Sequence, residues 1–187
     1  MARDISKPKG KRAKSKFAKL IRDIPDYPKP GILFKDITPL LGDAKSFRKM
    51  NKQIAKSFEH IDFDYVAGIE ARGFIIAAGL ASLTKTGFIP IRKKGKLPGA
   101  TLSQSYDLEY GTDTLEIHTG LIPPNSKVLL VDDVLATGGT AVASINLLKR
   151  ANLEVVGIGF LLEIDGLSGR LKIENSFPKL EVKVLVQ

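Results

Sequence analysis

The chain alternates two kinds of hydrophobic pattern. Short, nearly continuous apolar runs predict strands that are buried on both faces, as in a parallel sheet. Between these runs, apolar residues recur every three or four positions, which predicts helices with one buried face. The runs expected as strands are 65–69, 88–91, 128–131, 154–162 and 179–186, and the segments expected as helices are 43–58, 74–83 and 141–149.

Strands that alternate with helices predict an α/β fold with a mostly parallel central sheet flanked by helices. Residues 114–118 alternate between polar and apolar, so we expect a half-exposed antiparallel strand there. The prolines and the glycine within 25–31 predict a rigid loop. Residues 100–112 are polar and aromatic with weak order signals, which indicates a long loop of the kind that often closes over a site.

Three of the expected loops carry chemically distinctive residues. In open α/β sheets, ligands bind at the carboxyl ends of the strands. The loops at 70–73, 92–99 and 132–140 each follow a strand predicted to be parallel. We therefore expect these loops to meet at one edge of the sheet.

The most informative segment is 128–140. Two adjacent carboxylates, Asp132 and Asp133, end an apolar strand, and a loop of small residues then leads into a helix. Glycines let the backbone approach an anion closely, and a helix N-terminus offers unpaired N–H groups. Carboxylates next to a bound phosphate suit sugar hydroxyls or Mg²⁺. An ordinary turn capped by Thr140 would explain the glycines but not the acidic pair, and the P-loop and dinucleotide fingerprints are absent.

The other two loops carry basic side chains. Arg72 follows the strand at 65–69, where its planar guanidinium suits a diphosphate, and the alternative is a surface arginine at a helix start. Several cations surround Gly95 and repel one another unless they bind an anion, and the alternative is a solvated basic loop. These cations are Arg92, Lys93, Lys94 and Lys96.

Composition narrows the class of protein. The 187 residues are 43% hydrophobic and 26% charged, as in a single globular domain. There is no cysteine, which excludes disulfides and thiol catalysis and fits the cytoplasm. No apolar run approaches the ~18 residues of a membrane span, and we expect no secretory signal. His60 and His118 share no ligand spacing, so we expect no histidine metal site.

The net charge of +9 is concentrated at the N-terminus. Residues 1–20 contain eight basic residues and one acidic residue, whereas 21–187 is nearly balanced. We expect 1–20 to be a basic, mobile extension and 21–187 to be a single domain. We favour the interpretation that 1–20 is a solvated tail. The alternative is that this segment, and no other part of the chain, contacts nucleic acid.

Residues 131–140 resemble the phosphoribosyl pyrophosphate signature of the type I phosphoribosyltransferases. The Leu-Ala-Thr-Gly-Gly-Thr variant at 135–140 is similar to that of the adenine-specific members. Five motifs between Ile21 and Leu162 match the family. The resemblance implies the type I phosphoribosyltransferase fold, with a small N-terminal hood and a flexible active-site loop.

The resemblance also implies roles for individual residues. The adenine-binding stretch is Leu33, Phe34 and Lys35, the last at a position where family members usually have arginine. A non-proline cis peptide is expected at Glu70–Ala71. Glu109 and Tyr110 belong to the catalytic loop, and Arg72 is the third residue expected to be catalytic. Pyrophosphate is expected at Ala71, Arg72, Lys93 and Lys96, and the ribose 5′-phosphate at Asp132, Asp133, Ala136, Thr137, Gly138, Gly139 and Thr140.

The implied activity is purine salvage, in which adenine and phosphoribosyl pyrophosphate give AMP and pyrophosphate. The implied cofactor is Mg²⁺, carried by the substrate with Asp132 and Asp133 as its only candidate protein ligands. Family members are usually homodimers, and Lys96 is expected to reach across the dimer interface. Two alternatives stay open: a nucleic-acid-binding regulator that senses phosphoribosyl pyrophosphate, and an enzyme for 6-oxopurines.

Overall fold

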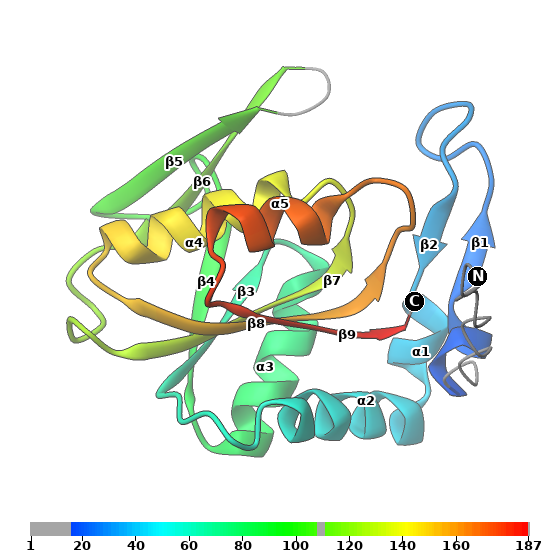
Figure 1. The fold of residues 1–187 in the computed structure, drawn as a ribbon, viewed down its shortest axis with the longest axis horizontal. Helices are drawn as coiled ribbons and strands as arrows, with labels where there is room; N and C mark the ends of the chain where they lie inside the picture. Colours follow the sequence, from blue (N-terminus) through cyan, green and yellow to red (C-terminus); the bar gives the residue numbers. More distant parts are fainter. Residues whose placement is uncertain (1–15, 108–110, 187) are drawn as a thin grey trace, which may run out of the picture.

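The main sheet has seven strands in the order β5-β6-β4-β3-β7-β8-β9 (Figure 1). The computed structural model describes residues 16–107 and 111–186. Strands β3, β4, β7, β8 and β9 are parallel, and β6 and β5 extend the sheet antiparallel, which confirms the expected fold class. The strands are β3 (Tyr65–Ile69), β4 (Gly87–Lys93), β5 (Thr101–Asp107), β6 (Thr112–His118), β7 (Lys127–Leu135), β8 (Glu154–Glu163) and β9 (Glu181–Val186).

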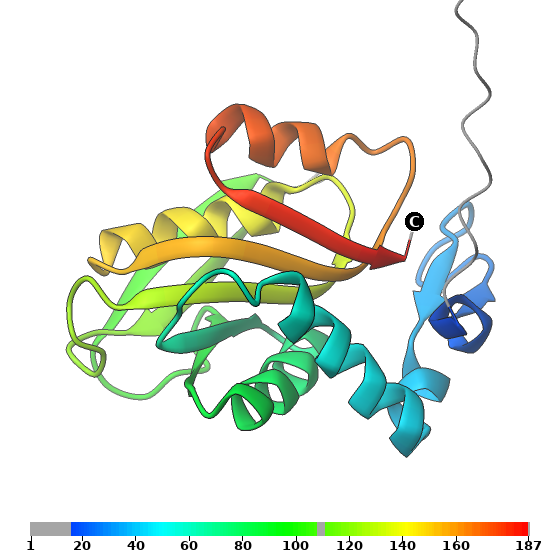
Figure 2. The same ribbon diagram turned by 60° about the horizontal axis from the view of Figure 1, so that its bottom comes forward.

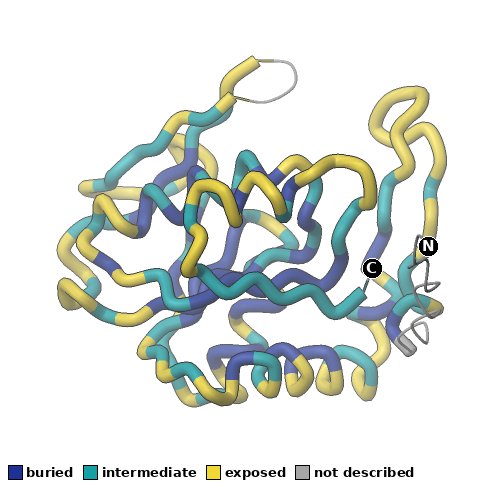
Figure 3. Tube along the Cα trace, in the orientation of Figure 1, coloured by how far each residue is buried: buried dark blue, intermediate teal, exposed yellow. Residues whose placement is uncertain are grey.

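Helices cover both faces of this sheet (Figure 2). Helices α2 (Ala44–Ser57) and α3 (Arg72–Thr84) lie on one face, and α4 (Gly139–Arg150) and α5 (Gly169–Ser176) lie on the other. Each face has its own buried apolar cluster, and the buried segments follow the central strands (Figure 3). Strand β7 serves both clusters, because Leu129 and Val131 face α2 and α3 while Leu130 faces α4.

The N-terminal part forms a small hood beside the carboxyl end of the sheet (Figure 1). It comprises the 3-10 helix η1 (Lys16–Leu20), the antiparallel pair β1 (Arg22–Ile24) and β2 (Phe34–Asp36), and the short helix α1 (Thr38–Gly42). Arg22 donates two hydrogen bonds to Asp36 Oδ2, at 3.0 and 2.5 Å. Phe17 is only 2% exposed and packs in the cluster that contains α2 and α3. The packed domain therefore already includes Phe17, which lies within the expected 1–20 extension, while 1–15 lie outside the described residues.

Helix α2 begins where the sequence predicted. The Asp43 carboxylate accepts a hydrogen bond from Ser46 N at 2.7 Å, which caps the helix. Met50, Ile54 and Phe58 are buried as a stripe against the sheet.

Among the described residues, no helix is long and apolar enough to cross a bilayer.

The prediction of a long loop at 100–112 is wrong for most of this segment. Residues 101–107 form β5, which pairs with β6 over seven registered positions and extends the sheet at one edge. The segment is polar because an edge strand has one wet face, and its hydroxyls pair across the hairpin, as Ser105 Oγ does with Thr114 Oγ1 at 3.0 Å. Only 108–110 lie outside the described residues at this point.

Candidate active site

The three chemically distinctive loops meet at one edge of the sheet, as predicted. Strands β4, β3 and β7 are parallel neighbours, so their carboxyl ends lie side by side. Glu70, just after β3, accepts a hydrogen bond from Lys93 N at the end of β4, at 2.9 Å. Arg72 Nε lies 2.7 Å from Asp133 Oδ2 near the end of β7.

Arg72, the first residue of α3, joins the hood to the sheet. Its Nη1 donates to the Lys35 carbonyl at 3.0 Å, and its guanidinium carbon lies 4.8 Å from the centre of the Phe34 ring. Its Nε forms the ion pair with Asp133. One guanidinium therefore holds the stretch at 33–35 against the acidic pair.

The acidic pair is crowded and poorly solvated. Asp133 is 5% exposed, and Asp132 Oδ1 accepts a hydrogen bond from Asp133 N at 2.9 Å. Burial raises the pKa of both carboxyls, the charge of Asp133 raises the pKa of Asp132 further, and Arg72 opposes the shift. A glycine at position 73 makes room for the Asp132 side chain, because a Cβ on residue 73 would lie 2.7 Å from Asp132 Oδ1. Hydroxyl donors or a cation would stabilise such a pair in its charged form.

The loop at 136–140 leads into α4 through Gly138, whose φ of +77° favours glycine. No side chain caps α4, so the capped-turn alternative is wrong: the Thr140 hydroxyl instead donates to Tyr106 Oη at 3.4 Å. The first N–H groups of a helix have no intrahelical partner. This uncapped N-terminus fits an anion.

Close packing against α5 fixes the position of this loop. A Cβ on Gly138 would lie 2.6 Å from the Gly169 carbonyl oxygen, and a Cβ on Gly169 would overlap the Ala136 carbonyl oxygen. Two glycines thus let the loop and the start of α5 touch backbone to backbone. The sequence analysis did not identify α5, because the helix is short and begins among glycine and serine residues.

Glu70 organises the basic loop. Its carboxylate accepts hydrogen bonds from Lys96 Nζ at 2.6 Å, from Arg92 Nε at 3.3 Å and from Lys93 N. Burial alone would raise the pKa of Glu70, but these hydrogen bonds lower it to about 2. The side chains of Arg92 and Lys96 are therefore paired around one carboxylate. Sequence reasoning missed this role of Glu70, although its position directly after a buried strand was a usable signal.

Lys93 is held by the β5–β6 hairpin. Its Nζ lies 3.1 Å from Asp113 Oδ2, and Tyr106 Oη donates to the same carboxylate at 3.4 Å. The hydrogen bond and the charge of Asp113 raise the pKa of Lys93. Because Tyr106 also contacts Thr140, the hairpin touches both the basic loop and the loop at 136–140.

The hood lines a cavity at the edge of the sheet. Phe34 packs edge-on against Tyr27, with ring centres 5.2 Å apart, and Leu33 is 50% exposed. Leu33 and Lys35 line a cavity of about 690 Å³ that extends to the ends of β8 and β9. The Lys35 ammonium pairs with Asp23 at 2.7 Å, so its backbone carbonyl, and not its charge, faces Arg72.

Comparison with known proteins decides the family. Residues 40–184 match the model of the phosphoribosyl transferase domain. The adenine phosphoribosyltransferase of Halothermothrix orenii is 54% identical over 157 residues, which cover 84% of this chain and 92% of that protein. The crystal structure of the adenine phosphoribosyltransferase from Thermoanaerobacter pseudethanolicus has a TM-score of 0.86 at 47% identity and covers 90% of this chain and 96% of its own. The chain belongs to the adenine phosphoribosyltransferase family.

A further relative in this family was crystallised with ligands. The adenine phosphoribosyltransferase of Saccharomyces cerevisiae, 34% identical with a TM-score of 0.83, was solved in complex with an imino-altritol bisphosphate and adenine. The alignment covers 91% of this chain and 96% of the yeast chain.

The Glu70–Ala71 peptide of the present structure is cis, which confirms the expectation from the family resemblance.

Not every predicted site residue can be placed in this adenine phosphoribosyltransferase fold. Glu109 and Tyr110 lie outside the described residues. His60 pairs with Glu181 at 2.8 Å, and His118 contacts the carbonyl oxygen of Pro98, within the loop at 92–99, at 2.9 Å. No group of three or more metal-binding side chains occurs among the described residues.

Proposed function

We propose that this protein converts adenine and phosphoribosyl pyrophosphate to AMP and pyrophosphate, as the names of its relatives state for those proteins. One observation carries the proposal: an uncapped helix N-terminus, a buried acidic pair and a cluster of cations lie together at one edge of the sheet. Such a site offers separate places for a phosphate, for sugar hydroxyls and for a diphosphate.

The sugar phosphate is proposed to lie along β7 and its loop. Residues 136–140 would receive the 5′-phosphate through backbone N–H groups and the hydroxyls of Thr137 and Thr140. Asp132 and Asp133 would accept hydrogen bonds from the ribose hydroxyls. This arrangement is supported by the raised pKa values of the two carboxyls, since hydroxyl donors would stabilise their charged forms.

The leaving group is proposed to lie across the β3 and β4 loops, on Ala71, Arg72, Lys93 and Lys96. In the structure each of the three cations pairs with a carboxylate: Asp133, Asp113 and Glu70 in turn. Pyrophosphate would replace these partners. Their charge would then stabilise pyrophosphate as it departs, which is the electrostatic part of catalysis.

The base is proposed to stack on Phe34, with the backbone of Leu33 and Lys35 reading its edge. The exposure of Leu33 and the cavity beside it support this position. Adenine N9 would attack the anomeric carbon through a transition state with oxocarbenium character, which the two aspartates would stabilise. Glu109 would manage the proton of the imidazole ring and Tyr110 would help to close the site over it.

Mg²⁺ fits this site as a companion of the substrate. Mg²⁺ binds six oxygen ligands and usually retains several water molecules among them. The acidic pair alone offers too few oxygen ligands to complete its coordination shell from described protein residues. When bound, Mg²⁺ would neutralise charge on the diphosphate. Asp132 and Asp133 are the side chains placed to contact it or its water.

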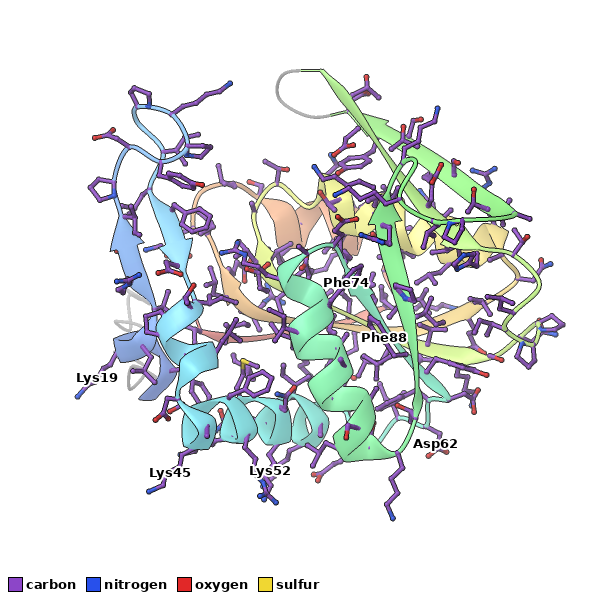
Figure 4. All side chains as sticks on the ribbon, turned by 180° about the vertical axis from the view of Figure 1, so that it is seen from behind. Lys19, Lys45, Lys52, Asp62, Phe74 and Phe88 are labelled. Carbon is purple, nitrogen blue, oxygen red and sulfur yellow. The ribbon has the colours of Figure 1, made fainter. Side chains whose placement is uncertain are left out.

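We also propose a homodimer that forms through α3 and β4. Ile75, Leu83 and Phe88 are 45%, 39% and 37% exposed, and Phe74 packs edge-on against Phe88 (Figure 4). An apolar patch of this kind is usual at an interface between subunits. We place the protein in the cytoplasm, in agreement with its lack of cysteine. We propose that 21–187 carries catalysis, with Phe17 packed against it.

A base-competition assay tests the function. Purified protein with Mg²⁺, phosphoribosyl pyrophosphate and equal adenine and hypoxanthine should give AMP. Preferred use of hypoxanthine would overturn the substrate assignment. No nucleotide product, together with salt-sensitive binding of DNA or RNA, would favour the regulator instead.

A further inference from the structure

The loop proposed for the 5′-phosphate has no charge of its own. Residues 136–140 are Ala, Thr, Gly, Gly and Thr, and the first basic side chain of α4 is Lys149, in its last turn. A phosphate monoester carries roughly −1.5 to −2 charges at neutral pH. Backbone dipoles and hydroxyls would have to hold this charge next to the two carboxylates of β7, so a nearby cation would improve binding.

Lys172 of α5 supplies such a cation. Its Nζ lies 3.7 Å from the position that a Cβ would take on Gly139, the first residue of α4. The same position is 3.6 Å from the Asp107 carbonyl oxygen and 3.8 Å from Tyr106 Cδ2. The ammonium therefore lies close to the N-terminus of α4, where the β5–β6 hairpin also approaches Gly139.

Two features make the Lys172 ammonium available to an anion at this loop. The first turn of α5 is fixed against the loop by the glycine contacts described above, so the base of the lysine is held in place. Its ammonium has no ion pair or hydrogen bond with any described residue, whereas Arg72, Lys93 and Lys96 each have a carboxylate partner. Its charge is thus available at the end of the loop where an anion would sit.

We infer that Lys172 binds the 5′-phosphate of the sugar substrate, from outside the loop that the family motif covers. The inference rests on the proposed function for the identity of the ligand. It adds a charged contact that favours phosphorylated over unphosphorylated ribosides, because only the former place an anion next to the ammonium.

Binding of ribose 5-phosphate, followed by calorimetry, tests this inference without turnover. Lys172→Gln should weaken binding about 10-fold, as expected for loss of a charge-assisted hydrogen bond. Lys172→Arg should retain most of the affinity. Inorganic pyrophosphate should bind equally well to all variants, and Lys52→Gln is the matched control because Lys52 points away from the body of the protein on α2 (Figure 4).

In turnover, Lys172→Gln should raise KM for phosphoribosyl pyrophosphate and leave KM for adenine unchanged. Equal affinity of the wild type and Lys172→Gln for ribose 5-phosphate would overturn the inference, as would an equal loss in the Lys52→Gln control. A wild-type protein that binds ribose 5-phosphate but forms no AMP would overturn the proposed function alone, since the binding comparison would still decide the role of Lys172.

Discussion

At the scale of single residues, Arg72 uses the shape of its side chain as well as its charge. Its contacts with Asp133, the Lys35 carbonyl and the Phe34 ring need a planar group with several donors. A lysine keeps the charge but satisfies one of these partners at a time. Arg72→Lys should therefore lower kcat/KM for AMP formation about 100-fold. Unchanged kcat/KM in a variant with wild-type circular dichroism would contradict the proposed role.

Asp36 makes the hood sensitive to acid. Its hydrogen bonds from Thr38 and Arg22 lower its pKa to about 2. In the unfolded chain the pKa of an aspartate is near 4. The charged Asp36 carboxylate therefore stabilises the fold fully above pH 4, and this contribution is lost as the pH falls towards 2.

Asp36→Asn should therefore lower the free energy of unfolding at pH 7, and the difference from wild type should shrink between pH 4 and pH 2. Urea unfolding at a series of pH values measures this difference. Exposed Asp62, labelled in Figure 4, gives the control substitution Asp62→Asn. A difference that stays constant down to pH 2 would show that the Asp36 carboxylate is not the cause.

Sequence reasoning predicted that the three loops meet at one edge of the sheet, but not which side chains pair there. Lys35 is predicted to belong to the stretch that binds the base, but nothing in the sequence shows that its carbonyl meets Arg72, 37 residues further along the chain. Likewise, the position of Glu70 after a buried strand marks it as a candidate, but the local pattern does not show that it pairs with Arg92 and Lys96. Such pairings depend on which strands are neighbours, so they follow only once the sheet order is known.

At the scale of elements, the contact between α5 and the loop at 136–140 leads to a steric prediction. Gly169→Ala should push the loop away, because the new methyl group would overlap the Ala136 carbonyl oxygen. We expect a loss of about 1–3 kcal/mol in stability and a higher KM for phosphoribosyl pyrophosphate. Gly42→Ala is the control, since nothing lies within 4 Å of its Cβ position. An unchanged KM would show that the loop tolerates the shift.

Most elements that the sequence predicted have a buried stripe, and the exception is β9, whose residues are only partly buried. Strands β3, β7 and β8 and helices α2, α3 and α4 all contribute to the two apolar clusters, and their patterns are strong. Strands β1, β2 and β5 and helix α5 are short or lie at an edge, so few of their residues are buried and their periodicity is weak. Their structure follows from tertiary contacts instead.

At the scale of the whole molecule, the exposed apolar face of α3 and β4 predicts the assembly. Phe88→Asp should convert a dimer to a monomer, because a buried unpaired charge is costly at an interface. Sedimentation equilibrium measures the mass. Leu121→Asp is the matched control, since Leu121 is 68% exposed outside this face. A wild-type protein that sediments as a monomer would refute the proposed interface.

The bridge that Arg72 makes between hood and sheet has a thermodynamic consequence. A sugar diphosphate that draws the guanidinium away from the Lys35 carbonyl changes the hood before any base has arrived. The affinity of each substrate then depends on whether the other is bound, and the factor must be the same in both directions. Through one side chain, the two halves of the site share a single coupling free energy.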